Sequence, residues 1–263
     1  MRLTNYHSHT FRCQHAFDTE EDFVLQAIRT GFEVLGFADH TPWPYKSDYV
    51  SNIRMRIDQF PDYLETLRAL REKYRDQIDL RIGLECEGFP EFYPWLREIR
   101  SAGLVDYLIL GNHNDTTDEN HSGLYFGACR QPEDLYRYME TTIAGMDSGL
   151  FAYLAHPDLF LHQYPVFDDA ARTVSSALAK EAKRLHMPLE YNLLGCRRRD
   201  ADRAHGSIGY TSEEFWETAA EVGGTAIIGV DAHKAADLDC LDLYAQSRDK
   251  LTKLGFTVLE TLD

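Results

Sequence analysis

Short apolar segments with strand character alternate with longer amphipathic segments along the whole 263-residue chain. This alternation is the strongest constraint on the fold, because a strand, a crossover helix and a further strand together build a parallel sheet. Seven strands are expected, at residues 3–6, 34–38, 80–84, 107–110, 152–155, 189–192 and 226–230. Six helices are expected between them, at residues 20–30, 57–75, 91–101, 132–147, 168–185 and 212–222.

An α/β chain of this kind forms either an open doubly wound sheet or a closed barrel. Nearly every expected strand runs into a His, Asp or Glu. A barrel explains this pattern, because its functional groups collect at the carboxyl ends of the strands. Barrels commonly use about 250 residues as one unit, and the sequence has no repeat, low-complexity tract or linker. The sequence therefore predicts a single α/β barrel domain over residues 1–263.

Charge and composition exclude several classes of protein. The 27 basic and 43 acidic side chains leave a net charge of −16, which repels phosphate backbones and anionic lipids. General nucleic-acid binding and membrane binding are therefore not expected. No apolar stretch reaches the length of about 18 residues that suggests a membrane span, and the first residues lack the layout of a signal peptide, so we expect a cytoplasmic protein. The five cysteines contain no C-x-x-C pair, and free thiols are expected.

Metal-binding side chains follow most of the expected strands. The first strand runs into Tyr6-His7-Ser8-His9-Thr10, and His7 and His9 face the same side because side chains alternate along a strand. One H-x-H pair is weak evidence by itself. The other candidates are His15 in the first loop, His40, Glu85, His113, His156, and the pair Asp231 and His233. Imidazole and carboxylate ligands suit Zn, Mn or Fe, and nine ligands exceed the needs of two ions. Three divalent metal ions are therefore expected, with their identity open.

The order of these motifs resembles that of the polymerase and histidinol phosphatase (PHP) family: H-x-H, then His, Glu, His, His and a final D-x-H. The resemblance runs from His7 to His233 and is greatest to the histidinol-phosphatase type, with its H-x-H-T opening. It implies a distorted (β/α)7 barrel with the metal site at the carboxyl ends of the strands. It also implies three groups of ligands: His7, His9, Glu85 and Asp231 on one ion, Glu85, His113 and His156 on a second, and His15, His40 and His233 on a third.

The resemblance implies a metal-dependent phosphomonoesterase, with L-histidinol phosphate of histidine biosynthesis as the expected small-molecule substrate. Ions bridged by a carboxylate lower the pKa of a shared water, so that hydroxide attacks phosphorus. One alternative is a PHP-type phosphoesterase or phosphodiesterase acting on another small phosphate ester. A hydrolase of C–N bonds and a non-catalytic, metal-stabilised interaction module are further alternatives. The sequence does not predict the oligomeric state.

A leaving alkoxide needs a proton, and two candidate acids lie near the expected ligands. Asp18, three residues after His15, is the first and His233 is the second. Asp18 is equally well explained as the cap of the helix expected from residue 20. Asp39 and Asn112, next to expected ligands, are candidates for orienting imidazoles.

Phosphate binding is expected from Arg197, Arg198 and Arg199, in a loop after the sixth strand, because guanidinium groups match phosphate oxygens in a two-point fork. Arg197 is the first choice, although a charge run in a loop is more often merely solvated. Histidinol-phosphatase-type members tend to carry an arginine soon after the His of the fifth strand. In this chain His162 is the only potentially cationic residue of that stretch, which leaves the natural substrate open.

Overall fold

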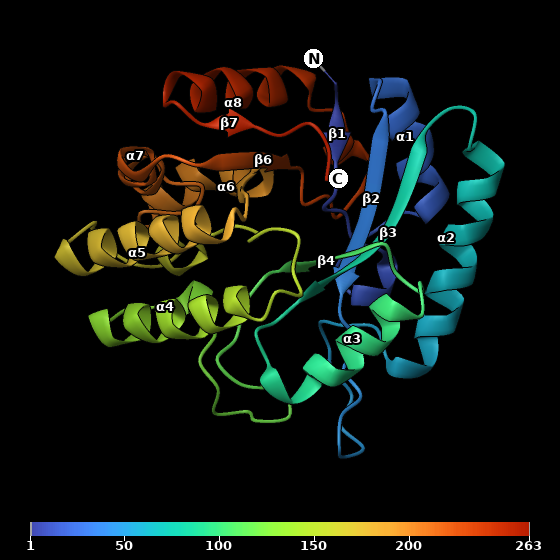
Figure 1. The fold of residues 1–263 in the computed structure, drawn as a ribbon, viewed down its shortest axis with the longest axis horizontal. Coiled ribbons are helices and arrows are strands. Elements are labelled where there is room, and N and C mark those ends of the chain that lie inside the picture. Colours follow the sequence, from blue (N-terminus) through green and yellow to red (C-terminus); the bar gives the residue numbers. More distant parts are fainter. Residues whose placement is uncertain (1, 263) are drawn as a thin grey trace.

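The computed structural model describes residues 2–262 and places the strands side by side in a curled parallel sheet (Figure 1). The strands are β1 (Thr4–Asn5), β2 (Val34–His40), β3 (Asp79–Cys86), β4 (Tyr107–Leu110), β5 (Leu189–Asn192), β6 (Thr225–Gly229) and β7 (Thr257–Val258). They form two runs, in the orders β1-β2-β3-β4 and β5-β6-β7, and every neighbouring pair is parallel.

Isolated bridges join the two runs into a distorted barrel. Leu154 pairs with Leu110 at the end of β4 and with Leu189 at the start of β5. On the other side, Ser8 pairs with Ala232, just beyond β1 and β6. The expected seven-stranded barrel is thus present, but the strand expected at 152–155 is reduced to the bridge at Leu154. The short strand β7, which pairs with β6, was not expected.

In the described part of the chain, eight α-helices cover the outside of the sheet (Figure 1). They are α1 (Glu20–Thr30), α2 (Phe60–Tyr74), α3 (Tyr93–Ser101), α4 (Pro132–Asp147), α5 (Asp169–Leu185), α6 (Leu193–Ala204), α7 (Glu213–Val222) and α8 (Leu241–Lys253). The six expected helices are all present. Helices α6 and α8 were not predicted, and the placement of residues 197–199 in a loop was wrong because α6 includes them. Asn192 starts α6, since its side chain accepts a hydrogen bond from Gly195 N at 2.9 Å.

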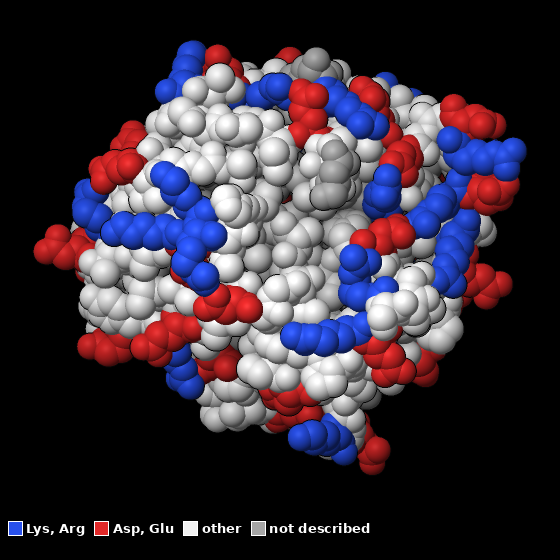
Figure 2. Space-filling view, in the orientation of Figure 1, with Lys and Arg blue, Asp and Glu red and all other residues white. Residues whose placement is uncertain are grey.

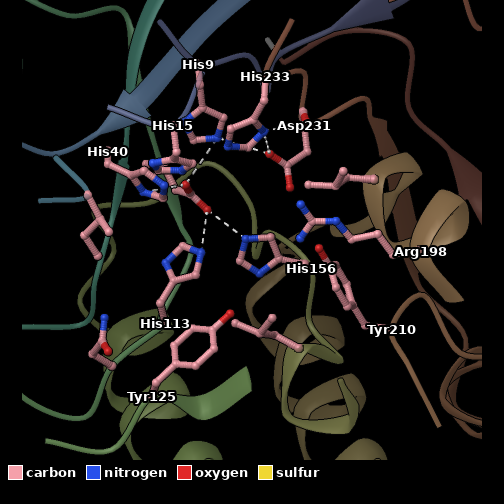
Figure 3. Close-up of a pocket in the computed structure, with 15 residues that line it drawn as sticks. His9, His15, His40, His113, Tyr125, His156, Arg198, Tyr210, Asp231 and His233 are labelled. Carbon is pink, nitrogen blue, oxygen red and sulfur yellow. Dashed lines mark hydrogen bonds and ion pairs between the residues drawn. The ribbon is translucent and has the colours of Figure 1, made fainter. Parts of the chain in front are cut away.

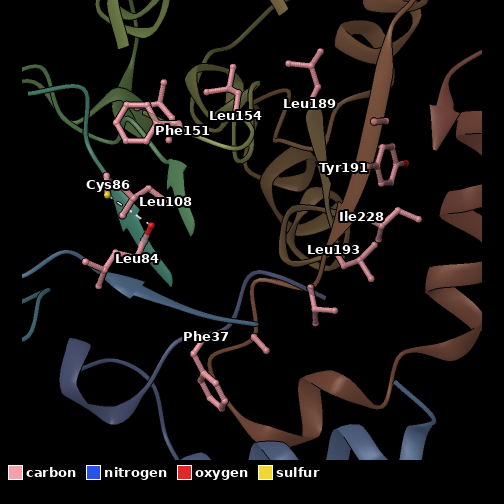
Figure 4. Packing of buried hydrophobic residues seen from close by; sticks show 14 of the residues in the cluster. Phe37, Leu84, Cys86, Leu108, Phe151, Leu154, Leu189, Tyr191, Leu193 and Ile228 are labelled. Carbon is pink, nitrogen blue, oxygen red and sulfur yellow. Dashed lines mark hydrogen bonds between the residues drawn. The ribbon is translucent and has the colours of Figure 1, made fainter. Parts of the chain in front are cut away.

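Two apolar clusters pack around the strands. The larger lies between the strands and the helices and includes Phe37, Leu108 and Ile228 (Figure 4). The smaller includes the Tyr6 and Tyr107 rings, which meet edge to face with 5.6 Å between their centroids. The Tyr107 hydroxyl donates to Tyr6 O at 2.6 Å.

Charged side chains of both signs share the face of the molecule seen in Figure 2, where Lys and Arg lie among Asp and Glu around a hollow with few charges. Within residues 2–262, no helix combines the length and the apolar character that crossing a bilayer requires.

Candidate metal centre

The nine predicted ligands lie together where the strands end, and Figure 3 shows most of them around one cavity. Glu85, on β3, is at their centre. Its Oε1 lies 2.7, 3.4 and 3.5 Å from the Nε2 atoms of His156, His113 and His7. Its Oε2 lies 3.0 Å from His40 Nδ1 and 3.6 Å from His9 Nε2. The two oxygens of one buried carboxylate therefore face two different sets of imidazoles.

The H-x-H pair meets the final D-x-H motif across the closure of the barrel. His9 Nε2 lies 3.1 Å from Asp231 Oδ1 and 3.3 Å from His7 Nε2. The backbones here are hydrogen bonded, since His9 N donates to Ala232 O at 2.9 Å. Strand alternation thus brings two imidazoles and a carboxylate to one point, as the sequence predicted.

A further group consists of His15, His40 and His233, whose ring nitrogens lie within 4.8 Å of one another. The His15 ring centroid lies 4.9 Å from that of His233 and 5.3 Å from that of His40. His15 is exposed and comes from the first loop, where its Nδ1 lies 2.7 Å from Cys13 O. This contact leaves the other ring nitrogen of His15 free to face the group.

The donor atoms fit divalent cations. Glu85 Oε2 and His40 Nδ1 are buried, and neither has a hydrogen-bond partner among residues 2–262, although they lie 3.0 Å apart. A buried polar atom without a partner is costly, and a bound cation would satisfy both atoms. Mixed imidazole and carboxylate donors are typical ligands of Zn, Mn and Fe.

Electrostatics keep two carboxylates and two imidazoles of the donor set in the protonation states that bind metal. Burial raises the pKa of the Glu85 and Asp231 carboxyls, but the surrounding imidazoles outweigh burial and hold both pKa values well below the usual range. Burial lowers the pKa of His40 and of His233 to about 3, and the neighbouring His9 adds to this effect. Ionised carboxylates and neutral imidazoles are the forms that coordinate a cation.

A second set of carboxylates holds the far side of three imidazoles. The contacts are His7 Nδ1 with Glu190 Oε1 at 2.8 Å, His9 Nδ1 with Asp39 Oδ1 at 3.4 Å, and His113 Nδ1 with Glu87 Oε1 at 3.0 Å. Such contacts fix the tautomer and orientation of a metal-binding histidine. Asp39 was a candidate for this task, whereas Glu87 and Glu190 were missed. Asn112 does not share it, because its side chain donates to Thr142 of α4 at 2.7 Å.

Two glycines leave room for the carboxylates of the centre. A Cβ on Gly229, at the end of β6, would lie 1.8 Å from Glu190 Oε1. A Cβ on Gly111, just after β4, would lie 2.6 Å from Glu85 Oε1. Both distances are far below a van der Waals contact, so any larger residue at either position would displace a carboxylate.

The cavity has a volume of about 440 Å³, and only part of its wall consists of the predicted ligands. The remaining wall residues are Ile53, Asn114, Tyr125, Leu159, Leu194, Arg198 and Tyr210. Within residues 2–262, Arg198 is the only Lys or Arg of the wall. Figure 3 shows its side chain reaching toward the metal ligands, with the Tyr210 hydroxyl beside it.

The neighbours of Arg198 on α6 point elsewhere. Arg197 Nη2 donates to Asp237 O at 2.6 Å, and Arg199 Nη1 donates to Thr211 O at 3.2 Å. The first choice among the three arginines, Arg197, therefore lies outside the cavity wall, and Arg198 lies on it. The helix explains this difference, because successive residues turn by about 100° around its axis.

Of the two candidate acids, His233 lines the cavity and Asp18 does not. Asp18 Oδ2 accepts a hydrogen bond from Ala235 N at 2.9 Å. Asp18 is not the helix cap either, since the Thr19 side chain caps α1 by accepting from Asp22 N. His162, the possible cation after His156, also lies outside the wall, with its Nδ1 3.1 Å from Asp202 Oδ2.

Comparison with known proteins agrees with this geometry. A family model described as the PHP domain matches residues 5–193. The chain belongs to the PHP domain family. Curated relatives of this PHP protein include a probable histidinol-phosphatase of Deinococcus radiodurans, 26% identical over 255 residues, with 90% of this chain and 88% of the relative covered. The histidinol-phosphatase of Bacillus subtilis is 24% identical over 262 residues, which cover 90% of this chain and 96% of that protein.

A solved structure has the same PHP fold. The histidinol phosphate phosphatase of Lactococcus lactis, crystallised with zinc, L-histidinol and phosphate, matches with a TM-score of 0.71 at 18% identity. The match covers 100% of this chain and 99% of that one. The predicted distorted α/β barrel is thereby confirmed.

Proposed function

We propose that this PHP protein is a metal-dependent phosphomonoesterase and that L-histidinol phosphate is its substrate. The observation that carries the proposal is the composition of the cavity wall. One cavity of about 440 Å³ is lined both by candidate metal ligands and by Arg198. Divalent cations and a guanidinium fork both bind phosphate oxygens and neutralise their charge. The names of the curated relatives support the substrate. Five free thiols support a location in the cytoplasm.

The ligand groups support three divalent ions. As the family resemblance implies, we assign His7, His9, Glu85 and Asp231 to one ion, Glu85, His113 and His156 to a second, and His15, His40 and His233 to a third. The ring nitrogens of the third set lie within 4.8 Å of one another, and Glu85 Oε1 lies within 3.5 Å of His7, His113 and His156. Bound at these residues, divalent ions would supply hydroxide at neutral pH and neutralise charge on the phosphate oxygens. Their identity, Zn, Mn or Fe, depends on availability as well as on the ligands.

The chain's own residues have separate tasks in this proposal. Arg198 binds the non-bridging phosphate oxygens, and the Tyr210 hydroxyl beside it donates to the same group. Neither candidate acid is assigned the task of protonating the leaving group, because Asp18 lies outside the wall and burial lowers the pKa of His233 to about 3, so that His233 is a neutral ligand. Glu85, His9 and His156 in the cavity wall are at most 2% exposed, so little bulk water reaches them.

A second candidate is a phosphatase or phosphodiesterase for another small phosphate ester. The specific observation in its favour is the single arginine of the wall, because His162 does not reach the cavity in place of the missing arginine. With fewer cationic contacts for the phosphate, the apolar wall residues contribute more to the choice of ester.

Phosphate release tests both candidates. The protein is assayed with histidinol phosphate, several other phosphomonoesters and a nucleotide phosphodiester, after loading with zinc or manganese and after chelation. We expect metal-dependent turnover with the highest kcat/KM for histidinol phosphate. Higher kcat/KM for another ester would reject the substrate and keep the metal chemistry. The absence of turnover with every ester would favour a non-catalytic, metal-stabilised module.

A further inference from the structure

Arg54 is a buried arginine outside the metal ligands, with only 1% of its side chain exposed. It lies in the loop of residues 41–56 that follows β2, here named the β2 loop. Its Nε donates to Asp118 Oδ2 at 2.8 Å, and its Nη2 donates to Glu87 Oε1 at 2.6 Å. One guanidinium therefore joins two carboxylates, Glu87 and Asp118, that lie 31 residues apart in the sequence.

Asp118 belongs to the loop of residues 111–125 that follows β4, here named the β4 loop. Its Oδ2 also accepts hydrogen bonds from the Tyr45 hydroxyl at 2.8 Å and from the Ser51 hydroxyl at 2.9 Å. Three side chains of the β2 loop thus converge on one carboxylate of the β4 loop. These are the main polar contacts that hold the two loops together, with Ser47 and Glu119 at their exposed edge.

Both loops form one wall of the cavity. Ile53, next to Arg54, represents the β2 loop in that wall, and Asn114 and Tyr125 represent the β4 loop. Helix α6, which carries Arg198, contributes another part of the wall. A change in the packing of the two loops would alter the space available to the leaving group of a substrate.

At its other end, the same guanidinium reaches the metal centre. Glu87 lies 3.0 Å from His113 Nδ1 and also accepts from Asn114 N at 3.2 Å. His113 Nε2 in turn lies 3.4 Å from Glu85 Oε1. A continuous series of contacts therefore runs from the β4 loop through Arg54 and Glu87 to a candidate ligand of the second ion.

Charge explains why this position requires an arginine. Glu87 has no exposed surface, and a buried carboxylate is stable only when its oxygens are paired. A guanidinium can bind two carboxylates at once through separate N–H groups, whereas a lysine is a single point charge. Removal of the Arg54 charge would leave Glu87 and Asp118 without their common cation.

We propose that Arg54 is a positioning residue that couples the substrate wall to the metal centre. It holds Glu87 against His113, which orients that imidazole toward its ion, and it holds the β4 loop against the β2 loop, which shapes the space for the leaving group. The kinetic part of this inference rests on the proposed phosphatase function, and the metal-binding part does not.

Zinc retention tests the metal-binding part. Wild type and Arg54→Gln are dialysed against buffers of graded free zinc, and bound zinc per chain is measured by elemental analysis. We expect Arg54→Gln to lose one ion at about 10-fold to 100-fold higher free zinc than wild type, the usual effect of removing a residue that supports a ligand. The other ions should stay. Arg71→Gln is the matched control, because it removes an arginine paired with Asp106 away from the cavity.

The conservative variant separates the two tasks. Arg54→Lys retains a charge for Glu87 but cannot also bridge to Asp118. We expect it to restore zinc retention to within about threefold of wild type while KM stays raised by about tenfold, as for the loss of one charged hydrogen bond, and kcat changes little. Asp118→Asn breaks only the loop contact, so it should raise KM in the same way. It also carries the test if Arg54→Gln does not fold.

Three results would overturn the inference. The first is wild-type zinc retention and KM in Arg54→Gln or, if it does not fold, a wild-type KM in Asp118→Asn. The second is that Arg54→Gln releases all its zinc in one step as it unfolds, with unfolding measured by circular dichroism. Such a result would indicate a purely structural role. The third is an Arg54→Lys variant that fails to recover zinc retention. If no ester is turned over, the proposed function fails, but zinc retention in the Arg54 variants still decides the metal-binding part.

Discussion

The two sides of the cavity are built in different ways. The metal side comes mainly from the ends of parallel strands, and most of its donors are buried, with His7, Glu85 and His156 at most 2% exposed. The other side comes from loops and from α6, and its Tyr125 and Ile53 are 43% and 36% exposed. The chemistry is therefore carried by the ends of the strands and the choice of ester by the loops and α6, a division that barrel enzymes commonly show.

A change at the centre of the metal side should have the largest effect. Glu85→Gln removes a carboxylate whose two oxygens face different imidazoles. We expect kcat to fall by at least about 1000-fold, because metal ions contribute several kcal/mol to stabilising a phosphoryl transition state. Initial rates of phosphate release with excess zinc or manganese measure the effect. A loss below tenfold would mean that the reaction does not depend on this side.

Removing the positive charge of Arg198 from the cavity wall should have the second largest effect on activity. Arg198→Gln is expected to lower kcat/KM by about 10-fold to 100-fold, the value of one or two charged hydrogen bonds to phosphate. Arg197→Gln is the matched control, and its effect should stay within about threefold, because the Arg197 side chain donates to a backbone carbonyl outside the cavity. Equal losses in the two variants would contradict the assignment of Arg198.

Removing the charge of a carboxylate that orients a metal-binding histidine should have a smaller effect. Glu190→Gln keeps an acceptor for His156 N but loses the charge facing His7 Nδ1. We expect zinc affinity to fall by about tenfold, the lower end of the range for such supporting carboxylates. Competition with a chromophoric chelator measures it. An unchanged zinc affinity together with a raised KM would show that Glu190 acts on substrate binding and not on metal binding.

Removing an uncharged hydroxyl group from the cavity wall should have the smallest effect. Tyr210→Phe removes one hydroxyl beside Arg198, and a neutral hydrogen bond of about 1 kcal/mol corresponds to a roughly fivefold lower kcat/KM. Zinc content should not change. Tyr125→Phe, which removes a hydroxyl from the β4 loop, provides the comparison. If Tyr210→Phe loses zinc, the hydroxyl belongs functionally to the metal side.

The metal side was largely predictable from the sequence because local rules govern it. A strand places alternate side chains on one face, and a parallel barrel brings strand ends to one rim. These two rules locate His7, His9, Asp231 and His233. The strand expected at 152–155 still delivers His156 to the rim, although only Leu154 pairs as a strand residue.

The rest depends on contacts between distant residues. Glu190 faces His7 across 183 residues of sequence, and nothing in either segment indicates the pairing. The choice among three adjacent arginines depends on the rotation of α6, whose charged sequence carries too few apolar residues to reveal its inward side. Glu87 and Arg54 were missed for the same reason as Glu190.

The contact between Gly229 and Glu190 has a consequence for how this family varies in sequence. The missing side chain at residue 229 is the space that the Glu190 carboxylate occupies, so residue 229 cannot gain a side chain while Glu190 keeps its position. Among PHP proteins aligned to this chain, these two positions should covary. Relatives that replace the glycine should also have lost the glutamate, and with it the hydrogen-bonding partner of the first histidine in their H-x-H motif.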